Sequence, residues 1–186
     1  MRQGHPLQKS ASKKMETPGH SGNWLEIGPN QITIYSDGSK IPRKPSVGAS
    51  WLCPAHNLAE TVSLNNKISN YTAESIAIDK ALKAIHTLLD KSFVICSDAL
   101  SVLKAVTDPY YQDRNYYIYS IRRKINTLTD PLGPNKEITL LWIPSHKGLE
   151  ENEIADQLVK DATNLPPHPF WKVPASDFQK QYLEEM

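Results

Sequence analysis

The run SFVICSD at residues 92–98 is almost wholly apolar and lies between two segments with helical periodicity. A strand with so few polar positions is typical of one that is buried on both faces of a sheet. The amphipathic segments on either side of it can supply helices that cover those faces. The sequence therefore predicts a layered α/β domain.

The other elements can be read in order along the chain. Besides 92–98, strands are predicted at residues 31–37, 47–53, 60–68 and 137–144. Helices are predicted at residues 72–89, 99–107, 115–128 and 149–163. The resulting order is β-β-β-α-β-α-α-β-α, which indicates a mixed five-stranded sheet with helices on its faces.

All of these elements fall within residues 30–165, which we expect to form one domain. Residues 1–29 contain Gly, Pro, Ser, His and Lys with little apolar periodicity, so we expect a flexible leader or linker. Residues 166–186 open with closely spaced prolines that cannot begin a helix. We expect a C-terminal extension that lies on the domain or leads to another part of a longer chain.

The composition gives no sign of a strongly basic protein, a disulfide-linked protein or a membrane-spanning protein. Lys and Arg total 21 against 20 for Asp and Glu, so no global basic charge indicates a nucleic-acid partner. Cys53 and Cys96 stand in apolar runs without metal-ligand spacing, which favours free core thiols in a reducing compartment. No apolar run reaches membrane-spanning length, so we expect an intracellular protein, cytoplasmic or nuclear, without a membrane partner.

Two aspartates close predicted strands in similar contexts, Asp37 in YSDG and Asp98 in CSDA. If the two strands are parallel neighbours, their carboxyl groups converge at the edge where ligand and catalytic groups gather in α/β sheets. Two ionised carboxylates so close together repel each other unless a cation lies between them. An aspartate before a glycine is also common in ordinary turns, so Asp37 alone does not decide between these interpretations.

Glu74 lies on the apolar side of the helix predicted at residues 72–89, away from the face that carries Asp79 and Lys83. The apolar stripe comprises Ile78, Ala81, Leu82, Ile85 and Leu89. A carboxylate on this side is costly unless it is paired or bound to a cation. The alternative is a solvated acid in the first turn, where the helix dipole favours negative charge.

The last predicted helix begins with several acids. Glu150, Glu151 and Glu153 fall in the first turn, where negative charge complements the helix dipole. Asp156 lies beyond that turn and off the Ile154–Leu158–Ala162 stripe, so it faces either a cleft or water. His146 precedes this helix on a loop and is either a surface residue or a group for proton transfer near neutral pH.

Four separated motifs together resemble the ribonuclease H family, particularly the domains attached to reverse transcriptases. HKGLEENEIADQLV resembles the family's H-x-G-x(3)-N-E-x(2)-D segment, and TIYSDGS resembles its first strand. YTAESIAIDKAL is similar to the helix that carries the catalytic glutamate, and FVICSDAL to the strand that ends in the second aspartate. The motifs occur in the family's order over residues 31–163.

Two further features resemble retroelement members of the family. No Lys/Arg-rich insertion separates the second helix from the last, and the strand before the histidine motif is short. The closing segment WKVPASDF is similar to the one that follows ribonuclease H in non-LTR retrotransposon polyproteins. The resemblance thus implies a retrotransposon domain, linked to a reverse transcriptase in the native polyprotein and monomeric in isolation.

The resemblance implies an endonuclease that cuts the RNA strand of an RNA/DNA hybrid and leaves 5′-phosphate and 3′-hydroxyl ends. Its site would consist of four metal-binding carboxylates, with His146 as an auxiliary catalytic group; the four are Asp37, Glu74, Asp98 and Asp156. Hard oxygen ligands favour Mg²⁺, with Mn²⁺ as a substitute. Four such ligands can hold two ions about 3.5–4 Å apart for in-line phosphoryl displacement.

Substrate contacts are expected from three polar residues beside this site, Ser39, Asn70 and Asn152. Cellular members commonly carry two amide residues before the catalytic glutamate, and here only Asn70 matches. Two basic trios could contact phosphates or could equally form solvated faces. These are Lys40, Arg43 and Lys44, and Arg122, Arg123 and Lys124.

Other interpretations stay open beside the hybrid nuclease. One is a domesticated, catalytically weak nucleic-acid-binding domain of the same fold, which the complete set of four acids and His146 argues against. Another is a transposase or a 3′–5′ exonuclease of the same broad fold, for which the spacing between His146 and Asp156 is less suitable. A plain structural domain would make the positions of Glu74 and of both strand-end aspartates coincidences.

Overall fold

The computed structural model describes residues 14–16, 27–110, 115–145, 150–168 and 171–178. Its strands are β1 (Lys14–Glu16), β2 (Ile32–Ser39), β3 (Ser46–Cys53), β4 (Leu58–Asn65), β5 (Ser92–Ser97) and β6 (Glu137–Trp142). Its α-helices are α1 (Asn70–Thr87), α2 (Leu100–Thr107), α3 (Tyr116–Thr129) and α4 (Glu150–Ala162), and a short 3₁₀ turn covers Pro54–His56. The order from β2 to α4 is the predicted β-β-β-α-β-α-α-β-α.

The strands form one mixed sheet in the order β1-β6-β5-β2-β3-β4. β2 pairs in parallel with β5, and β5 in parallel with β6, whereas β2, β3 and β4 form an antiparallel meander. The predicted mixed five-stranded sheet is confirmed for β2 to β6. β1 adds a short parallel strand beside β6, within the segment for which the sequence predicts only a flexible leader.

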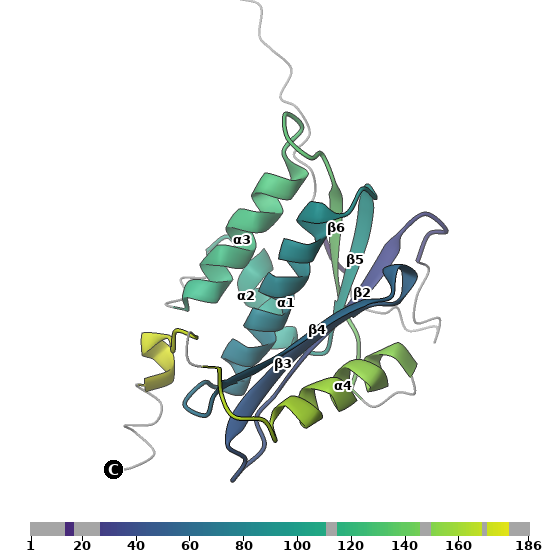
Figure 1. The fold of residues 1–186 in the computed structure, drawn as a ribbon. Helices are drawn as coiled ribbons and strands as arrows, with labels where there is room; N and C mark the ends of the chain where they lie inside the picture. The colour runs from purple at the N-terminus through teal and green to yellow at the C-terminus, as the bar shows by residue number, and fades with distance from the viewer. Residues whose placement is uncertain (1–13, 17–26, 111–114, 146–149, 169–170, 179–186) are drawn as a thin grey trace, which may run out of the picture.

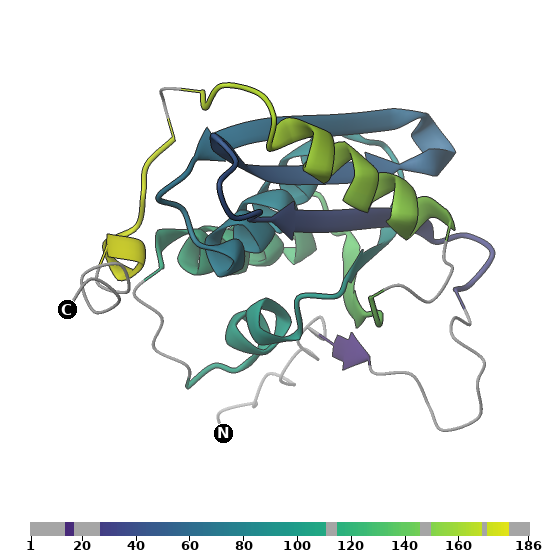
Figure 2. The ribbon, with the colours of Figure 1, turned by 90° about the horizontal axis from the view of Figure 1, so that it is seen from below.

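Helices cover both faces of the sheet, as Figures 1 and 2 show: α1, α2 and α3 lie on one face and α4 on the other. β5 illustrates why the chain needs this arrangement. Phe93 and Ile95 pack in the cluster on the α1–α3 side, whereas Val94 and Cys96 pack in the cluster that includes Ala155 of α4. The apolar run that predicts a doubly covered strand is therefore explained by its two hydrophobic surfaces.

The prediction that Leu89 belongs to the buried stripe of the first helix is wrong. Ile78, Ala81, Leu82 and Ile85 are fully buried, in agreement with the apolar stripe. Leu89 is 94% exposed, because α1 ends at Thr87 and the chain leaves the helical path before reaching it. The two cysteines, Cys53 and Cys96, are free and buried, as predicted for core thiols.

The predicted apolar stripe of the last helix, Ile154–Leu158–Ala162, is right at Ala162 but wrong at Ile154. Ile154 is 44% exposed, and the buried positions of α4 are Ala155, Val159 and Ala162. These small and medium side chains let α4 lie close to the sheet. At Gly48 of β3 a Cβ atom would be only 2.3 Å from the Val159 carbonyl oxygen, so the absence of a side chain there permits the contact.

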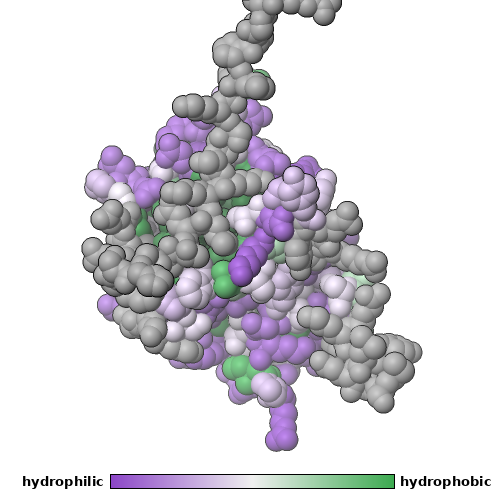
Figure 3. Space-filling model, turned by 180° about the vertical axis from the view of Figure 1, so that it is seen from behind, coloured by the Kyte–Doolittle hydropathy of each residue, from purple (hydrophilic) through white to green (hydrophobic). Residues whose placement is uncertain are grey.

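Across the described residues, no helix is long and apolar enough to cross a membrane. The face shown in Figure 3 is mainly hydrophilic where the structure describes it, with hydrophobic residues in small separate patches. Scattered hydrophobic residues of this kind are normal on protein surfaces and need no partner to explain them.

The contact between β3 and α4 gives a stability prediction. Gly48→Ala should lower the free energy of unfolding by about 1–3 kcal/mol, because the new methyl group must displace the backbone of α4. Gly133→Ala is the matched control, since its Cβ would meet its nearest neighbour at 3.5 Å, an ordinary contact. Urea denaturation of both variants measures the difference, and equal stabilities would contradict the proposed close packing.

Candidate active site

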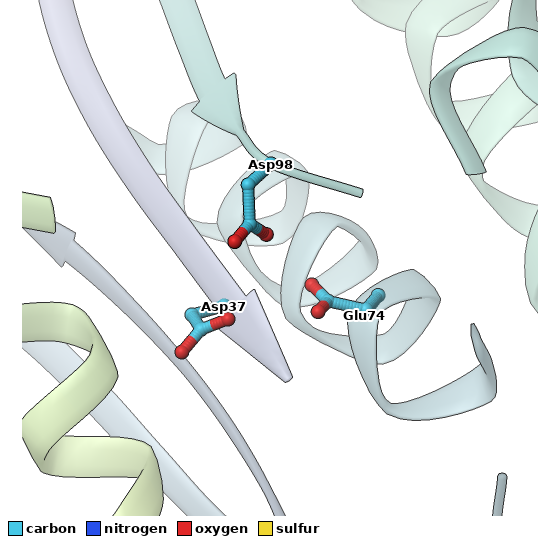
Figure 4. Close-up of side chains that lie close together, drawn as sticks. All are labelled: Asp37, Glu74 and Asp98. Atoms are coloured by element: carbon cyan, nitrogen blue, oxygen red, sulfur yellow. The ribbon is translucent and has the colours of Figure 1, made fainter. Parts of the chain in front are cut away.

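The parallel pairing of β2 with β5 brings two of the predicted acids together. In this register Tyr35 lies opposite Cys96, so both strands reach their carboxyl ends at the same edge of the sheet. Asp37 lies in the last part of β2, and Asp98 directly follows β5. Figure 4 shows their carboxyl groups turned toward the same space. The convergence that the sequence predicts for parallel neighbouring strands is therefore present.

Glu74 is supplied by the beginning of α1, the helix that packs beside this edge. Its side chain is 5% exposed and points toward the two aspartates (Figure 4). α1 approaches β2 so closely that a Cβ on Gly38 would be 2.4 Å from the Glu74 backbone nitrogen. The buried interpretation of Glu74 is therefore confirmed, and the alternative of a solvated first-turn acid is wrong.

One oxygen from each of Asp37, Glu74 and Asp98 lies within 4.8 Å of the others. Among the described residues, Glu74 Oε2 is buried and has no hydrogen-bond partner. Burial is costly for such an atom, and it indicates a group that is completed by something other than the described protein atoms. Such a set of convergent carboxyl oxygens is suited to a hard divalent cation.

The electrostatics of the cluster agree with this interpretation. Burial, followed by the negative charges of Asp98 and Asp156, raises the pKa of Asp37 from its ordinary 3.8 to about 7. Burial and the charges of Asp37 and Asp98 raise the pKa of Glu74 well above its ordinary value. Both shifts have the sign expected for carboxyl groups that are removed from water and placed beside like charges. A bound cation would counteract the effect of the neighbouring negative charges, because it places positive charge beside the carboxyl groups.

These acids line a polar cavity of about 190 Å³. Its lining also includes four other residues that the sequence predicts for the site, namely Asp156, Ser39, Asn70 and Asn152. The structure thus gathers every predicted site residue that it describes. His146 lies outside the described residues, so its predicted auxiliary role stays a prediction, as do the catalytic and substrate-binding roles of the others.

Asp156 contributes from α4, on the opposite face of the sheet from α1. It is half-buried, and its Oδ2 lies 2.5 Å from Lys160 Nζ one helical turn later. The hydrogen bond to Asp156 raises the pKa of the Lys160 ammonium group, and the Lys160 charge in turn offsets a small part of the rise in the pKa of Asp37. Lys160 therefore supplies positive charge beside the acidic cluster.

Three residues of the site do not emerge from the sequence reasoning. Lys160 could have been noticed from its i,i+4 spacing to Asp156. Ser145 lines the cavity and donates a hydrogen bond of 2.5 Å to Asp98 Oδ2. Gly38 permits the close approach of α1, which only the packing of two distant segments reveals.

Three residues of the two basic trios bind other parts of the same chain. Arg122 donates to the backbone carbonyls of Ala105, Val106 and Asp108 at the end of α2. Lys124 pairs with Asp79 at 2.6 Å. Lys44 donates a hydrogen bond to the side chain of Asn164. For these three residues the structure therefore shows intramolecular partners.

The shifted pKa of Asp37 predicts how stability depends on pH without metal. Between about pH 4 and 7, Asp37 is more protonated in the folded chain than in the unfolded chain. The free energy of unfolding therefore falls as the pH rises through this window. In EDTA, Asp37→Asn should therefore become more stable than the native chain as the pH increases, by roughly 3–6 °C in Tm at pH 8.

The same thermal melts include Mg²⁺ or Mn²⁺, which should raise the Tm of the native chain at pH 8 more than that of Asp37→Asn. Asp161→Asn, at an exposed position of α4, serves as a control and should follow the native pH profile. Identical profiles for Asp37→Asn and the native chain would show that the buried charge is not destabilising.

Comparison with known proteins agrees with the fold. The family model described as RNase H matches residues 29–164, which span the elements from β2 to α4 and contain all four predicted carboxylates. A search of the curated proteins finds no match. The family match covers well over half of the sequence and includes the helices on both sides of the sheet. The chain therefore belongs to the ribonuclease H family.

Proposed function

We propose that this chain is an endonuclease that cuts the RNA strand of RNA/DNA hybrids and leaves 5′-phosphate and 3′-hydroxyl ends. Membership of the ribonuclease H family supports a hybrid nuclease in general. The observation that carries the more specific proposal is the convergence of Asp37, Glu74 and Asp98 within 4.8 Å at the carboxyl edge of the sheet. Such a cluster is costly to the fold without a cation and suits metal-assisted hydrolysis.

Two divalent cations, Mg²⁺ or Mn²⁺, would be held by Asp37, Glu74, Asp98 and Asp156. When bound, such ions lower the pKa of an attacking water and stabilise the leaving 3′ oxygen. The donor set fits them, because it contains only hard oxygen ligands and includes a buried Glu74 oxygen that has no other partner among the described residues.

The protein itself orients these ligands from three directions. β2 and β5 fix Asp37 and Asp98 by their parallel pairing, and α1 holds Glu74 against the end of β2. Ser145 donates to one oxygen of Asp98. Asp156 is held by Lys160 on the α4 side, and the half-exposed pair can adjust when positive charge enters the cavity.

The polar rim of the cavity supports a role in substrate binding. Asn70 is held in place because its Oδ1 accepts a hydrogen bond from the Lys40 backbone N–H. Ser39 and Asn152 line the same cavity from β2 and α4. Side chains of this kind can contact the sugar–phosphate backbone and the 2′-hydroxyl that distinguishes RNA from DNA. His146, which follows Ser145 in the sequence, is proposed to assist proton transfer or product release.

We also propose that this activity belongs to reverse transcription of a retrotransposon, next to a reverse transcriptase in the native polyprotein. The support is the resemblance of the histidine motif and of the segment WKVPASDF to retroelement sequences. The alternative is a domesticated domain that binds nucleic acid without cutting it. Two observations favour the nuclease: the raised pKa of Asp37, and the Glu74 oxygen without a hydrogen-bond partner in the part of the chain that the structure describes. A binding domain has no need to maintain that cluster.

The activity prediction concerns the two strand-end aspartates. Asp37→Asn and Asp98→Asn should each reduce cleavage of a labelled RNA/DNA hybrid in Mg²⁺ by more than about 100-fold. Loss of a residue that only supports a metal ligand costs up to about 100-fold, and loss of a ligand itself should cost more. Asp161→Asn is the control for the loss of one carboxylate. The RNA ends and the strand that is cut are read on a sequencing gel, with all-DNA and all-RNA duplexes as comparisons.

Two results would contradict this assignment in different ways. Full cleavage by Asp37→Asn or Asp98→Asn would remove these residues from the active site. A native chain that binds the hybrid but leaves it intact in both Mg²⁺ and Mn²⁺ would favour the binding-only domain.

A further inference from the structure

The described part of the C-terminal extension, residues 166–168 and 171–178, lies against the ribonuclease H domain beyond the segment that matches the family. The His168 N–H donates to the Ser63 carbonyl oxygen of edge strand β4 at 3.0 Å. Lys80 of α1 lies over the Trp171 ring, with its Nζ 5.1 Å from the centroid. Figure 1 shows the following yellow helical turn beside the lower end of α1. The extension therefore contacts the sheet edge and α1.

Asp177 is a buried polar residue in the described part of this extension, with 4% of its surface exposed. Its Oδ2 accepts a hydrogen bond of 2.9 Å from the Ser69 backbone N–H. Its Oδ1 accepts bonds of 2.8 Å from the Ser69 hydroxyl and 3.0 Å from the Thr72 hydroxyl. All three donors belong to the N-terminus of α1, which is separated from Asp177 by more than one hundred residues.

This arrangement completes the cap of α1. Ser69 is the N-cap residue, and its Oγ accepts a hydrogen bond from the Thr72 backbone N–H. An N-cap side chain satisfies one of the free N–H groups at a helix start. The carboxyl group of Asp177 then holds the Ser69 hydroxyl and N–H, and places an acidic group where the helix dipole favours it.

The network continues into the neighbouring helix. Thr72 Oγ1 accepts a hydrogen bond of 2.7 Å from Asn115 Nδ2, and Asn115 Oδ1 accepts one from the Tyr117 backbone N–H. Asn115 is the N-cap residue of α3 and is 1% exposed. Asp177 is therefore hydrogen-bonded to a network that ties together the first turns of α1 and α3.

The first turns of α1 also carry the candidate site. Asn70 directly follows Ser69 and accepts a hydrogen bond from the Lys40 N–H, and Glu74 lies one turn further along the helix. We propose that Asp177 is a positioning residue of the nuclease: it fixes the first turn of α1 so that Asn70 and Glu74 stand correctly relative to Asp37 and Asp98. This inference rests on the proposed function and deepens it.

The physical reason is that Asp177 is hard to replace as an acceptor. Among the described residues, the Ser69 backbone N–H bonds to Asp177, and the Ser69 hydroxyl has otherwise only a longer bond of 3.2 Å to Thr72 Oγ1. An asparagine at this position has one acceptor oxygen and turns an NH₂ group toward donors. Buried donors without an acceptor are costly, so the first turn of α1 would move to find new partners. A displacement of about 1 Å among catalytic ligands can reduce a rate by up to roughly 100-fold.

The test compares Asp177→Asn with Asp130→Asn in the full chain. Asp130 follows α3 and accepts a backbone N–H from Leu132 near the opposite end of the sheet, where β6 begins. For Asp177→Asn, measured well below its Tm, kcat on the RNA/DNA hybrid should fall about tenfold and the Mg²⁺ concentration for half-maximal rate should rise. Amide hydrogen exchange should accelerate at residues 69–74 and stay unchanged in α4. Asp130→Asn should match the native chain in all three measurements.

A role confined to stability would give a different pattern. If Asp177→Asn lowers Tm while kcat, the Mg²⁺ requirement and exchange at residues 69–74 stay native at low temperature, the positioning role is overturned. If Asp177→Asn does not fold, Thr72→Val removes one donor to Asp177, together with the acceptor of Asn115 Nδ2, with little change of shape. It should show the same effects at smaller size, and native kinetics and exchange in that variant would also overturn the proposal.

Failure of the proposed function remains distinguishable from failure of this inference. If the native chain does not cut the hybrid, the nuclease proposal fails, and Mn²⁺ affinity by calorimetry together with exchange at residues 69–74 decides the role of Asp177. Weaker Mn²⁺ binding and faster exchange in Asp177→Asn would support positioning of Glu74. Native values for both would contradict it.

Discussion

The parallel hydrogen bonding of β2 to β5 is the interaction on which the rest of this structure depends. It aligns Tyr35 with Cys96 and so places Asp37 and Asp98 at one edge of the sheet. A parallel pair needs a crossover connection, and here the connection contains α1, which carries Glu74 to the same edge. The second face of these strands must also be covered, and α4 covers it while bringing Asp156. Fold and site are thus consequences of one pairing.

The clustered carboxyl groups that suit the site to a cation also destabilise the fold when no cation is bound. Three carboxyl groups lie within 4.8 Å of one another, and two of them are buried. Burial first, and then the repulsion between like charges, raises the pKa of Asp37. The protein offsets the repulsion in part with Lys160, whose positive charge lies on α4. Tight backbone contacts at Gly38 and Gly48, and the hydrogen bonds of Asp177, hold α1 and α4 against this repulsion. Strained electrostatics of this kind are common where a site must bind a cation strongly.

Local patterns in the sequence predict most of the fold and much of the site. The strand-end positions of Asp37 and Asp98 and the periodicity around Glu74 are local signals, and the structure confirms the convergence and burial they imply. The stripe of α4 is mispredicted at Ile154, because the helix packs on Gly48 of the sheet through Val159 and leaves Ile154 exposed. Asp177 and β1 are not predictable in this way, since their partners are contributed by remote segments whose contacts leave no periodic trace.

The central claim is that the converging acids form a site for divalent cations. Crystals of the native chain soaked in Mn²⁺ test it most directly, because anomalous scattering locates the ion independently of any activity. The account predicts Mn²⁺ among the carboxyl oxygens of Asp37, Glu74 and Asp98, with Asp156 turned from Lys160 toward the cavity. A cluster that stays free of Mn²⁺ at millimolar concentration, with the Asp156–Lys160 pair intact, would contradict it.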